Sequence, residues 1–279
     1  MNNYLMIQRL KKNFNELEFV KHHSKLFKYR KWKDHIYDQK VLLANELYFP
    51  EPETFNNDND PNDCIISLKK LSQLEIEVGL SNFYKKQHPR YNDSAIIKIV
   101  QNHLKFHFKD YEALDKRFKQ EDKAFDKKMG VLCLTHDPLN YKMWEQYGDN
   151  YTGICYGFKS VNLYNDLSKN SPVTAGKVLY STPKPEWNPF DQPEINVFRR
   201  IYCKDSKYKF EKEYRLKKTS VVNRISHFQD STLECIFLGA SMAEADKVDI
   251  IKIIKDRNLT IKVYQCAFHT NNQLSYFQI

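Results

Sequence analysis

The chain has 279 residues, of which 41% are hydrophobic and 14% aromatic, and it contains only 7 glycines. This composition is typical of a globular protein with a sizeable core, and it excludes a collagen-like or disordered chain. Lysine and arginine outnumber the acids by 44 to 35, which gives a net charge of +9. Such a surplus assists the approach of a polyanion without identifying one.

Cysteine usage and hydropathy indicate the compartment. The six cysteines are scattered without a C-x-x-C pair, and four of them lie in apolar runs typical of strands. The first residues, MNNYLMIQRLKKNF, hold no apolar core of signal-peptide length, and no apolar run reaches the roughly 18 residues that suggest a membrane span. We therefore expect a cytosolic protein with reduced, buried thiols and no membrane segment.

The first quarter of the chain alternates short apolar runs with polar loops. Residues 1–33 are basic and aromatic, and they fit either a helix docked on the body or a partner-binding arm. A strand at residues 26–30, a helix at 35–46 and a strand at 47–49 follow, and Pro50 and Pro52 end the second strand. The five acids of loop 50–64 could ligate a hard cation such as calcium, but the loop lacks the spacing of an EF-hand, so a metal is not the expected reading.

Residues 65–128 are polar and helical, and they read as an insertion into a single domain spanning 1–279. One apolar face of a long amphipathic helix, capped by Asp93 or Ser94, is predicted from residues that recur every three or four positions: Ile97, Val100, Leu104, Phe108, Tyr111, Leu114 and Phe118. His103 and His107 lie one turn apart on it, but no third metal ligand is visible.

The chain is organised around residues 130–158, where two apolar strand-like runs bracket a short aromatic helix. Later, residues 160–170 read as a helix and 177–181 as a strand, and a proline-rich loop carrying Trp187 and Phe190 is either a lid or a static surface loop. Residues 233–239, 243–257 and 259–268 read as strand, helix, strand, with a last edge strand at 273–279.

The pattern that most suggests a reactive site consists of two carboxylates and a guanidinium at alternate positions, Glu211, Glu213 and Arg215. On one strand, alternate residues share a face, so two carboxylates about 7 Å apart would lie beside a guanidinium. If both carboxylates were ionised and buried they would repel, so either the pKa of one rises or Arg215 compensates. An exposed strand carrying many ions would show the same pattern.

A family resemblance emerges from ordered landmarks. A strand ending in Cys-Leu-Thr is followed by Met143-Trp144-x-x-Tyr147 and later by Gly153 and Phe158. The other landmarks, in order, are Lys28-Tyr29-Arg30, Asn59-Asp60-Pro61, Asp63-Cys64, Val178, Tyr180, Lys204, Tyr208, Glu211, Glu213, Arg215 and residues 236–239. Together they resemble the uncharacterised bacterial domain-of-unknown-function family 2971. In loop 50–64 the chain departs from the family pattern, because Asn62 stands where an aromatic residue is usual.

The order of these parts is similar to that of the ADP-ribosyltransferase superfamily, although the His-Gly and Ser-Thr-Ser signatures of that superfamily are absent. The similarity implies NAD as the cofactor and an effector role as a toxin or in phage defence. It further implies Glu213 as the catalytic residue with Glu211 next, Arg30 as a contact of NAD and Tyr147 as a residue that stacks on it. Tyr29, Trp144 and Arg215 are expected to line the same ligand-binding pocket.

Two alternatives stay open. A nucleic-acid-binding effector or nuclease would explain the charge, but no PD-(D/E)xK, HNH or His-x-His constellation is present; a non-enzymatic interaction module would explain the aromatic loops. The absence of Walker, Rossmann, zincin and Gly-x-Ser-x-Gly motifs disfavours ATPases, dehydrogenases and serine hydrolases.

The predicted fold is α+β, with helices packed on a mostly antiparallel, partly mixed sheet of strands near residues 28, 48, 132, 155, 179, 212, 236 and 263.

Overall fold

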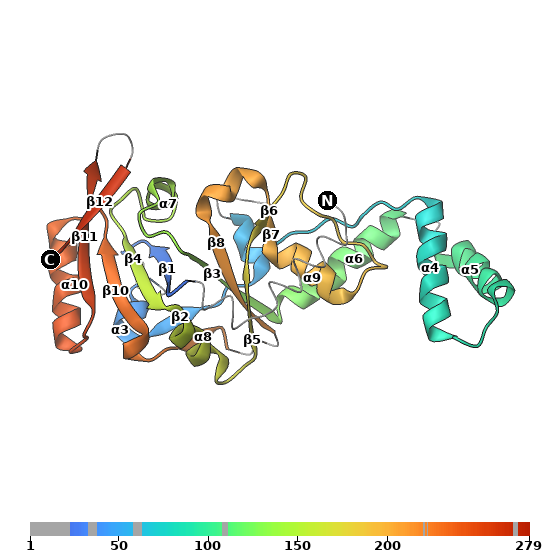
Figure 1. Cartoon of the computed structure of the whole chain (residues 1–279), viewed down its shortest axis with the longest axis horizontal. Coiled ribbons are helices and arrows are strands. Elements are labelled where there is room, and N and C mark those ends of the chain that lie inside the picture. The colour runs from blue at the N-terminus through green and yellow to red at the C-terminus, as the bar shows by residue number, and fades with distance from the viewer. Residues whose placement is uncertain are drawn as a thin grey trace.

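A mixed eight-stranded sheet forms the centre of the protein (Figure 1). The computed structural model describes residues 23–32, 38–57, 63–107, 111–219, 221, 223–269 and 273–279. In spatial order the strands are β12 (Gln273–Gln278), β11 (Lys262–His269), β10 (Leu233–Leu238), β4 (Ile154–Lys159), β1 (Lys25–Arg30), β3 (Met129–Thr135), β8 (Glu213–Thr219) and β5 (Val173–Lys177). Among the described strands of this sheet, only β10 and β11 pair in parallel, so the predicted α+β class and mostly antiparallel sheet are confirmed.

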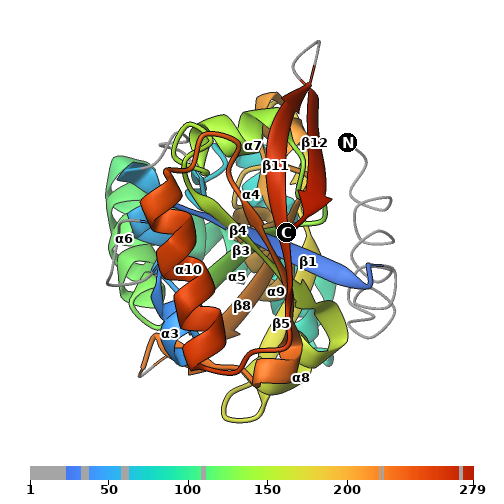
Figure 2. The same ribbon diagram turned by 90° about the vertical axis from the view of Figure 1, so that its left-hand side faces the viewer.

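Helices cover both faces of this sheet. On one face, α3 (Lys40–Ala44), α8 (Ser160–Ser168) and α10 (Glu244–Asp256) pack against strand residues such as Leu132, Ile154 and Tyr156. Figure 2 shows α10 lying beside α3 on this side. On the other face, α7 (Tyr141–Gln146) contributes Trp144 to a cluster with Cys155, and α9 (Pro193–Tyr202) packs on β3. The apolar runs predicted as strands at 130–134 and 152–158 are therefore buried from both sides.

Two predicted strands lie outside the main sheet. β2 (Glu46–Tyr48) pairs with β9 (Ile225–His227), and β6 (Leu179–Tyr180) pairs with β7 (Cys203–Lys204). The sheet edge near this region is instead β5, whose sequence VTAGK has no strong apolar alternation. Gly176 lets the ring of Tyr202 approach β5, because a Cβ at Gly176 would lie 2.7 Å from that ring. The assignments of strands 48 and 179 to the main sheet were wrong.

The segment predicted as one long helix contains separate helices. α5 (Asp93–His107) packs on α4 (Gln73–Gln87) through Leu80, Ile96 and Val100, whereas α6 (Tyr111–Asp126) packs near β3 and the 3-10 helix η1 (Pro52–Asn57). α4 and α5 form one end of the elongated molecule (Figure 1). The capping side chain is Asn92, whose Oδ1 accepts from the Ala95 amide at 2.9 Å, and not Asp93 or Ser94. The organisation as one domain with an insertion at 65–128 stays a prediction.

The proline-rich loop is tied to the α4–α5 pair. The Trp187 amide donates to the Ser67 carbonyl, and the Trp187 carbonyl accepts from the Lys69 amide. Phe190 packs over Gly79 of α4, where a Cβ would come within 2.3 Å of the ring. These contacts favour a static connection over a lid. Within the described part of the chain, no helix is both long and apolar enough to cross a membrane.

Candidate functional site

A cavity opens where the central sheet is split between β1 and β3. These neighbouring strands pair at Phe27 and Thr135, while each pairs along its length with its other neighbour. Further along β3, the Val131 amide donates to the Pro50 carbonyl at 3.0 Å, so the chain after β2 takes the place of β1. The space between encloses about 680 Å³, which lies within the usual range for small-molecule sites.

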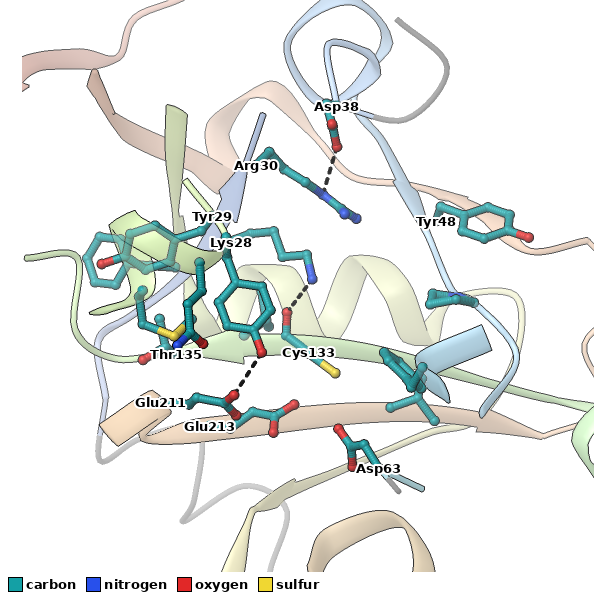
Figure 3. A pocket seen from close by; sticks show the side chains of 18 of the residues that line it. Lys28, Tyr29, Arg30, Asp38, Tyr48, Asp63, Cys133, Thr135, Glu211 and Glu213 are labelled. Carbon is teal, nitrogen blue, oxygen red and sulfur yellow. Dashed lines mark hydrogen bonds and ion pairs between the residues drawn. The ribbon is translucent and has the colours of Figure 1, made fainter. Parts of the chain in front are cut away.

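Charged and phenolic side chains line this cavity (Figure 3). They are Lys28, Tyr29, Arg30, Lys31, Asp38, Tyr48, Asp63, Tyr147, Lys204, Glu211 and Glu213. The cavity thus brings together five of the seven residues singled out in the sequence. Trp144 and Arg215 do not line it.

Glu211 reaches the cavity from a position that the strand prediction misplaced. It ends the 3-10 helix η2 (Ser206–Glu211), and Lys212 follows in the left-handed conformation with φ of 48°. β8 begins only at Glu213, so the predicted alternation of Glu211, Glu213 and Arg215 along one strand was wrong. The Glu211 carboxylate accepts from the Tyr147 hydroxyl at 2.8 Å and from Lys204 Nζ at 2.6 Å. Burial and the neighbouring Glu213 raise the pKa of Glu211 to about 7.

Glu213 lies beside Glu211 in an opposite electrostatic setting. Its two carboxylate oxygens accept from Arg215 Nε and Nη2, both at 2.8 Å, and Lys204 Nζ lies 3.7 Å away. Burial alone would raise the pKa of Glu213, but Arg215 and Lys204 outweigh it and hold that pKa below its ordinary value. The structure therefore contains two adjacent buried carboxyl groups whose pKa values are displaced in opposite directions.

Arg215 holds the carboxylates from behind the cavity. It is fully buried, and its Nη2 donates to both oxygens of Asp63 at 2.8 and 2.6 Å. Its Nη1 donates to the Ile201 carbonyl at 2.7 Å. The guanidinium thus supports Asp63 and Glu213 from outside the cavity lining, and a ligand-binding role for Arg215 stays a prediction.

Trp144 also belongs to the interior. It is 0% exposed, and its Nε1 donates to the Pro138 carbonyl at 2.9 Å. Its ring meets the Tyr29 ring edge-on at 5.1 Å, and the Tyr29 hydroxyl donates to the Asp137 carbonyl at 2.8 Å. Trp144 therefore supports Tyr29, which forms part of the wall, and its own ring faces are covered by protein.

Arg30 and Glu213 leave the sheet on opposite faces but line the same cavity. Leu26 and Tyr214 both belong to the core under α3, α8 and α10. Because side chains alternate along a strand, Arg30 shares the face of Leu26, and Glu213 faces away from Tyr214. The split between β1 and β3 removes the sheet that would separate them.

The β1 side of the cavity is cationic. Lys28 Nζ donates to the Cys133 carbonyl at 2.8 Å, and Arg30 Nε lies 3.2 Å from Asp38 Oδ1 (Figure 3). Burial and the nearby Arg30 lower the pKa of Lys28 to about 8. Lys28, Asp63 and Lys204 were recognised in the sequence only as landmarks, because no local pattern indicates that they meet Arg30, Glu211 and Arg215.

Other sequence hypotheses concern residues outside the cavity. In loop 50–64, Glu51 pairs with Arg224 at 2.9 Å and Glu53 with Lys123 at 3.7 Å, while residues 58–62 lie outside the described part. Among the described residues, no group of three potential metal ligands of the His, Cys, Asp and Glu types is found. The basic segment 9–22 also lies outside the described residues, so a continuous nucleic-acid-binding patch stays a prediction.

The fold and site define an α+β protein with a charged cavity in a split sheet. Residues 143–216 match the family described as "Protein of unknown function (DUF2971)", which confirms the resemblance to family 2971 over that segment. The matched segment contains Tyr147, Lys204, Glu211 and Glu213, which form the carboxylate end of the cavity. Comparison with curated proteins and with solved structures gave no match.

Proposed function

We propose that this chain is a cytoplasmic enzyme that cleaves the N-glycosidic bond of NAD, with water or another molecule accepting the ADP-ribose. The observation that carries the proposal is the division of charge in the cavity. Glu211 and Glu213 lie at one end, and Lys28, Arg30 and Lys31 line the β1 side. NAD has a matching division, with a cationic nicotinamide ribose and an anionic diphosphate. The six cysteines are free, which fits a reducing compartment.

The carboxylates take different roles in this reaction. As the ribose–nicotinamide bond breaks, its electron pair leaves with neutral nicotinamide, and positive charge develops on the ribose. Ionised Glu213 supplies negative charge close to that position. The oxygen of water or of the acceptor then forms the new bond to the ribose carbon, and its proton passes to Glu211, whose pKa of about 7 suits proton transfer near neutrality.

Tyr147 and Lys204 are positioning residues in this scheme. The Tyr147 hydroxyl and the Lys204 amine hold the two oxygens of Glu211, at 2.8 and 2.6 Å. Lys204 also lies 3.2 Å from Asp63, so its charge is shared among carboxylates and does not cancel any one of them fully. By the resemblance stated above, the biological role is that of an effector, as a toxin or in phage defence.

The test is nicotinamide release from NAD by the purified chain, with and without cell lysate as a source of acceptor. Glu211→Gln is expected to lower kcat by about 10²–10⁴-fold, since it removes the proton acceptor. Glu145→Gln is the matched control, because Glu145 is an exposed residue of α7 that does not line the cavity. It should leave the rate unchanged.

The pH profile distinguishes an acid–base role from a structural one. Glu211 accepts a proton only when ionised, so kcat should rise as pH increases through about 7. Glu213→Gln removes the negative charge that raises the pKa of Glu211, so the rise of kcat should move to lower pH. The maximal kcat should fall, because the charge that stabilises the ribose cation is also lost. Absence of NAD turnover by the wild-type chain under both conditions, or a Glu211→Gln variant as active as wild type, would refute the proposed reaction.

A further inference from the structure

The edge of β3 that faces the cavity has an unusual partner. Val131 bonds to Pro50, and Thr135 lies opposite Phe27 of β1. Cys133, which lies between them and faces the same edge, has its carbonyl satisfied by the Lys28 amine at 2.8 Å. A lysine side chain thus occupies the place where a paired strand would supply a backbone amide. The amine is held inside the split, within reach of whatever enters it.

The cationic side chains that line the cavity differ in how many carboxylates lie close to each of them. Lys204 lies near Asp63, Glu211 and Glu213, at 3.2, 2.6 and 3.7 Å. By contrast, within the described part of the chain no ion pair involves Lys28, and its hydrogen bond is to a neutral carbonyl. Arg30 has Asp38 as its ion-pair partner, at 3.2 Å. The β1 side therefore carries more positive than negative charge, and an ammonium has donors left for a ligand.

We propose that Lys28 and Arg30 form a subsite for the diphosphate of a nucleotide. A nucleotide bound there would bridge β1 and β3, the two strands that flank the split. This inference rests on the proposed function for the identity of the nucleotide, but the anion subsite stands on the charges alone. Lys28 supplies a point charge and Arg30 a planar pair of donors, a combination suited to adjacent phosphate groups. An anion at this place removes the electrostatic conflict between the two cations.

Binding at the subsite is coupled to a proton. The groups that act on the Lys28 amine are Arg30 on its own strand, Cys133 on β3, Glu213 on β8 and Asp38 before α3. Burial and Arg30 lower the pKa of Lys28 to about 8. A diphosphate prefers the protonated amine, so affinity should be full below pH 8 and should fall as the pH rises above it.

The experiment measures binding by calorimetry, with inorganic pyrophosphate, ADP-ribose and adenosine as probes. Lys28→Met is expected to weaken pyrophosphate and ADP-ribose binding by about tenfold or more, since it removes a charge-assisted contact. Binding of uncharged adenosine should not change. Lys159→Gln, which removes one exposed charge from neighbouring β4, is the control for net charge and should bind all probes as wild type does.

A second variant tests the proton coupling. Between pH 7 and 9.5, wild-type affinity for pyrophosphate should fall by about tenfold relative to the affinity of Lys28→Arg, which stays charged over that range. A decline shared by both proteins belongs to other groups such as Glu211, whose pKa is about 7.

The outcomes separate this inference from the proposed reaction. Pyrophosphate binding that depends on Lys28 supports the subsite even if NAD is not turned over. Wild-type protein that binds neither pyrophosphate nor ADP-ribose, or Lys28→Met that binds them as tightly as wild type, overturns it, even if nicotinamide is released. Should Lys28→Met not fold, equal pH profiles of wild type and Lys28→Arg would overturn it.

Discussion

Arg215 is the residue on which the carboxylate end of the cavity depends. It binds Asp63, 152 positions earlier in the chain, and Glu213, two positions earlier. Both carboxyl groups have pKa values held below the ordinary range, although burial acts the other way, because Arg215 and Lys204 outweigh it. Groups with lowered pKa values stabilise the fold above their unfolded pKa, near 4, and lose this contribution as pH falls through the folded value.

Replacement of Arg215 by methionine should therefore destabilise the protein strongly. It leaves two buried carboxylates with Lys204 as their remaining cation, and breaking a buried pair in this way costs about 3–5 kcal/mol. Urea unfolding at pH 7 measures the loss. The loss should shrink at pH 4, because without the guanidinium the pKa values of the two buried carboxyl groups rise, and at pH 4 the variant can fold with them protonated.

The control for Arg215→Met is Lys25→Met, which removes a partly exposed ion pair with Glu234. Pairs of that kind contribute about 1 kcal/mol or less. Equal losses for the two variants, or a loss for Arg215→Met that does not depend on pH, would contradict the account of a buried charge network.

At the scale of elements, local pattern predicted the strands that have a strong apolar run and failed elsewhere. β3 and β4 were predicted because a strand buried on both faces needs a continuous apolar run, and nearly every residue in each of them is buried. The junction before β8 was not, since Lys212 adopts a left-handed conformation that its residue type does not signal, as glycine or asparagine would. The meeting of Arg215 with Asp63 was likewise invisible, because periodicity reports only neighbours within one element.

The α4–α5 pair gives an element-scale prediction. Phe190 packs with Leu80, Ile96 and Val100 and covers Gly79. Phe190→Ala should open this end of the molecule locally, at a cost of about 1–3 kcal/mol, and limited proteolysis between residues 73 and 107 should become faster. Phe83→Ala in α4 is the control, since Phe83 is 50% exposed. A cleavage rate unchanged by Phe190→Ala would show that the loop does not hold the helices.

At the scale of the whole molecule, the split divides the central sheet into two sets of strands. β12, β11, β10, β4 and β1 lie on one side, and β3, β8 and β5 on the other. The cationic groups Lys28 and Arg30 come from the first set, whereas Glu213 begins β8 in the second. The cavity is a property of this long-range arrangement, which explains why the sequence predicted five of its residues but not the opening that joins them.

A ligand that contacts both sets should tie them together, because binding to the folded state opposes local opening of the strands it bridges. Hydrogen exchange of the backbone amides in β1 and β3 should therefore slow when ADP-ribose is added to the wild-type chain, while β11 and β12, away from the split, serve as the internal control. Lys28→Met should reduce the protection of both strands together, since the bridging contact is lost. Protection confined to one side of the split would mean that the ligand binds one set of strands without joining it to the other, and that the cavity is not the bridging site its geometry indicates.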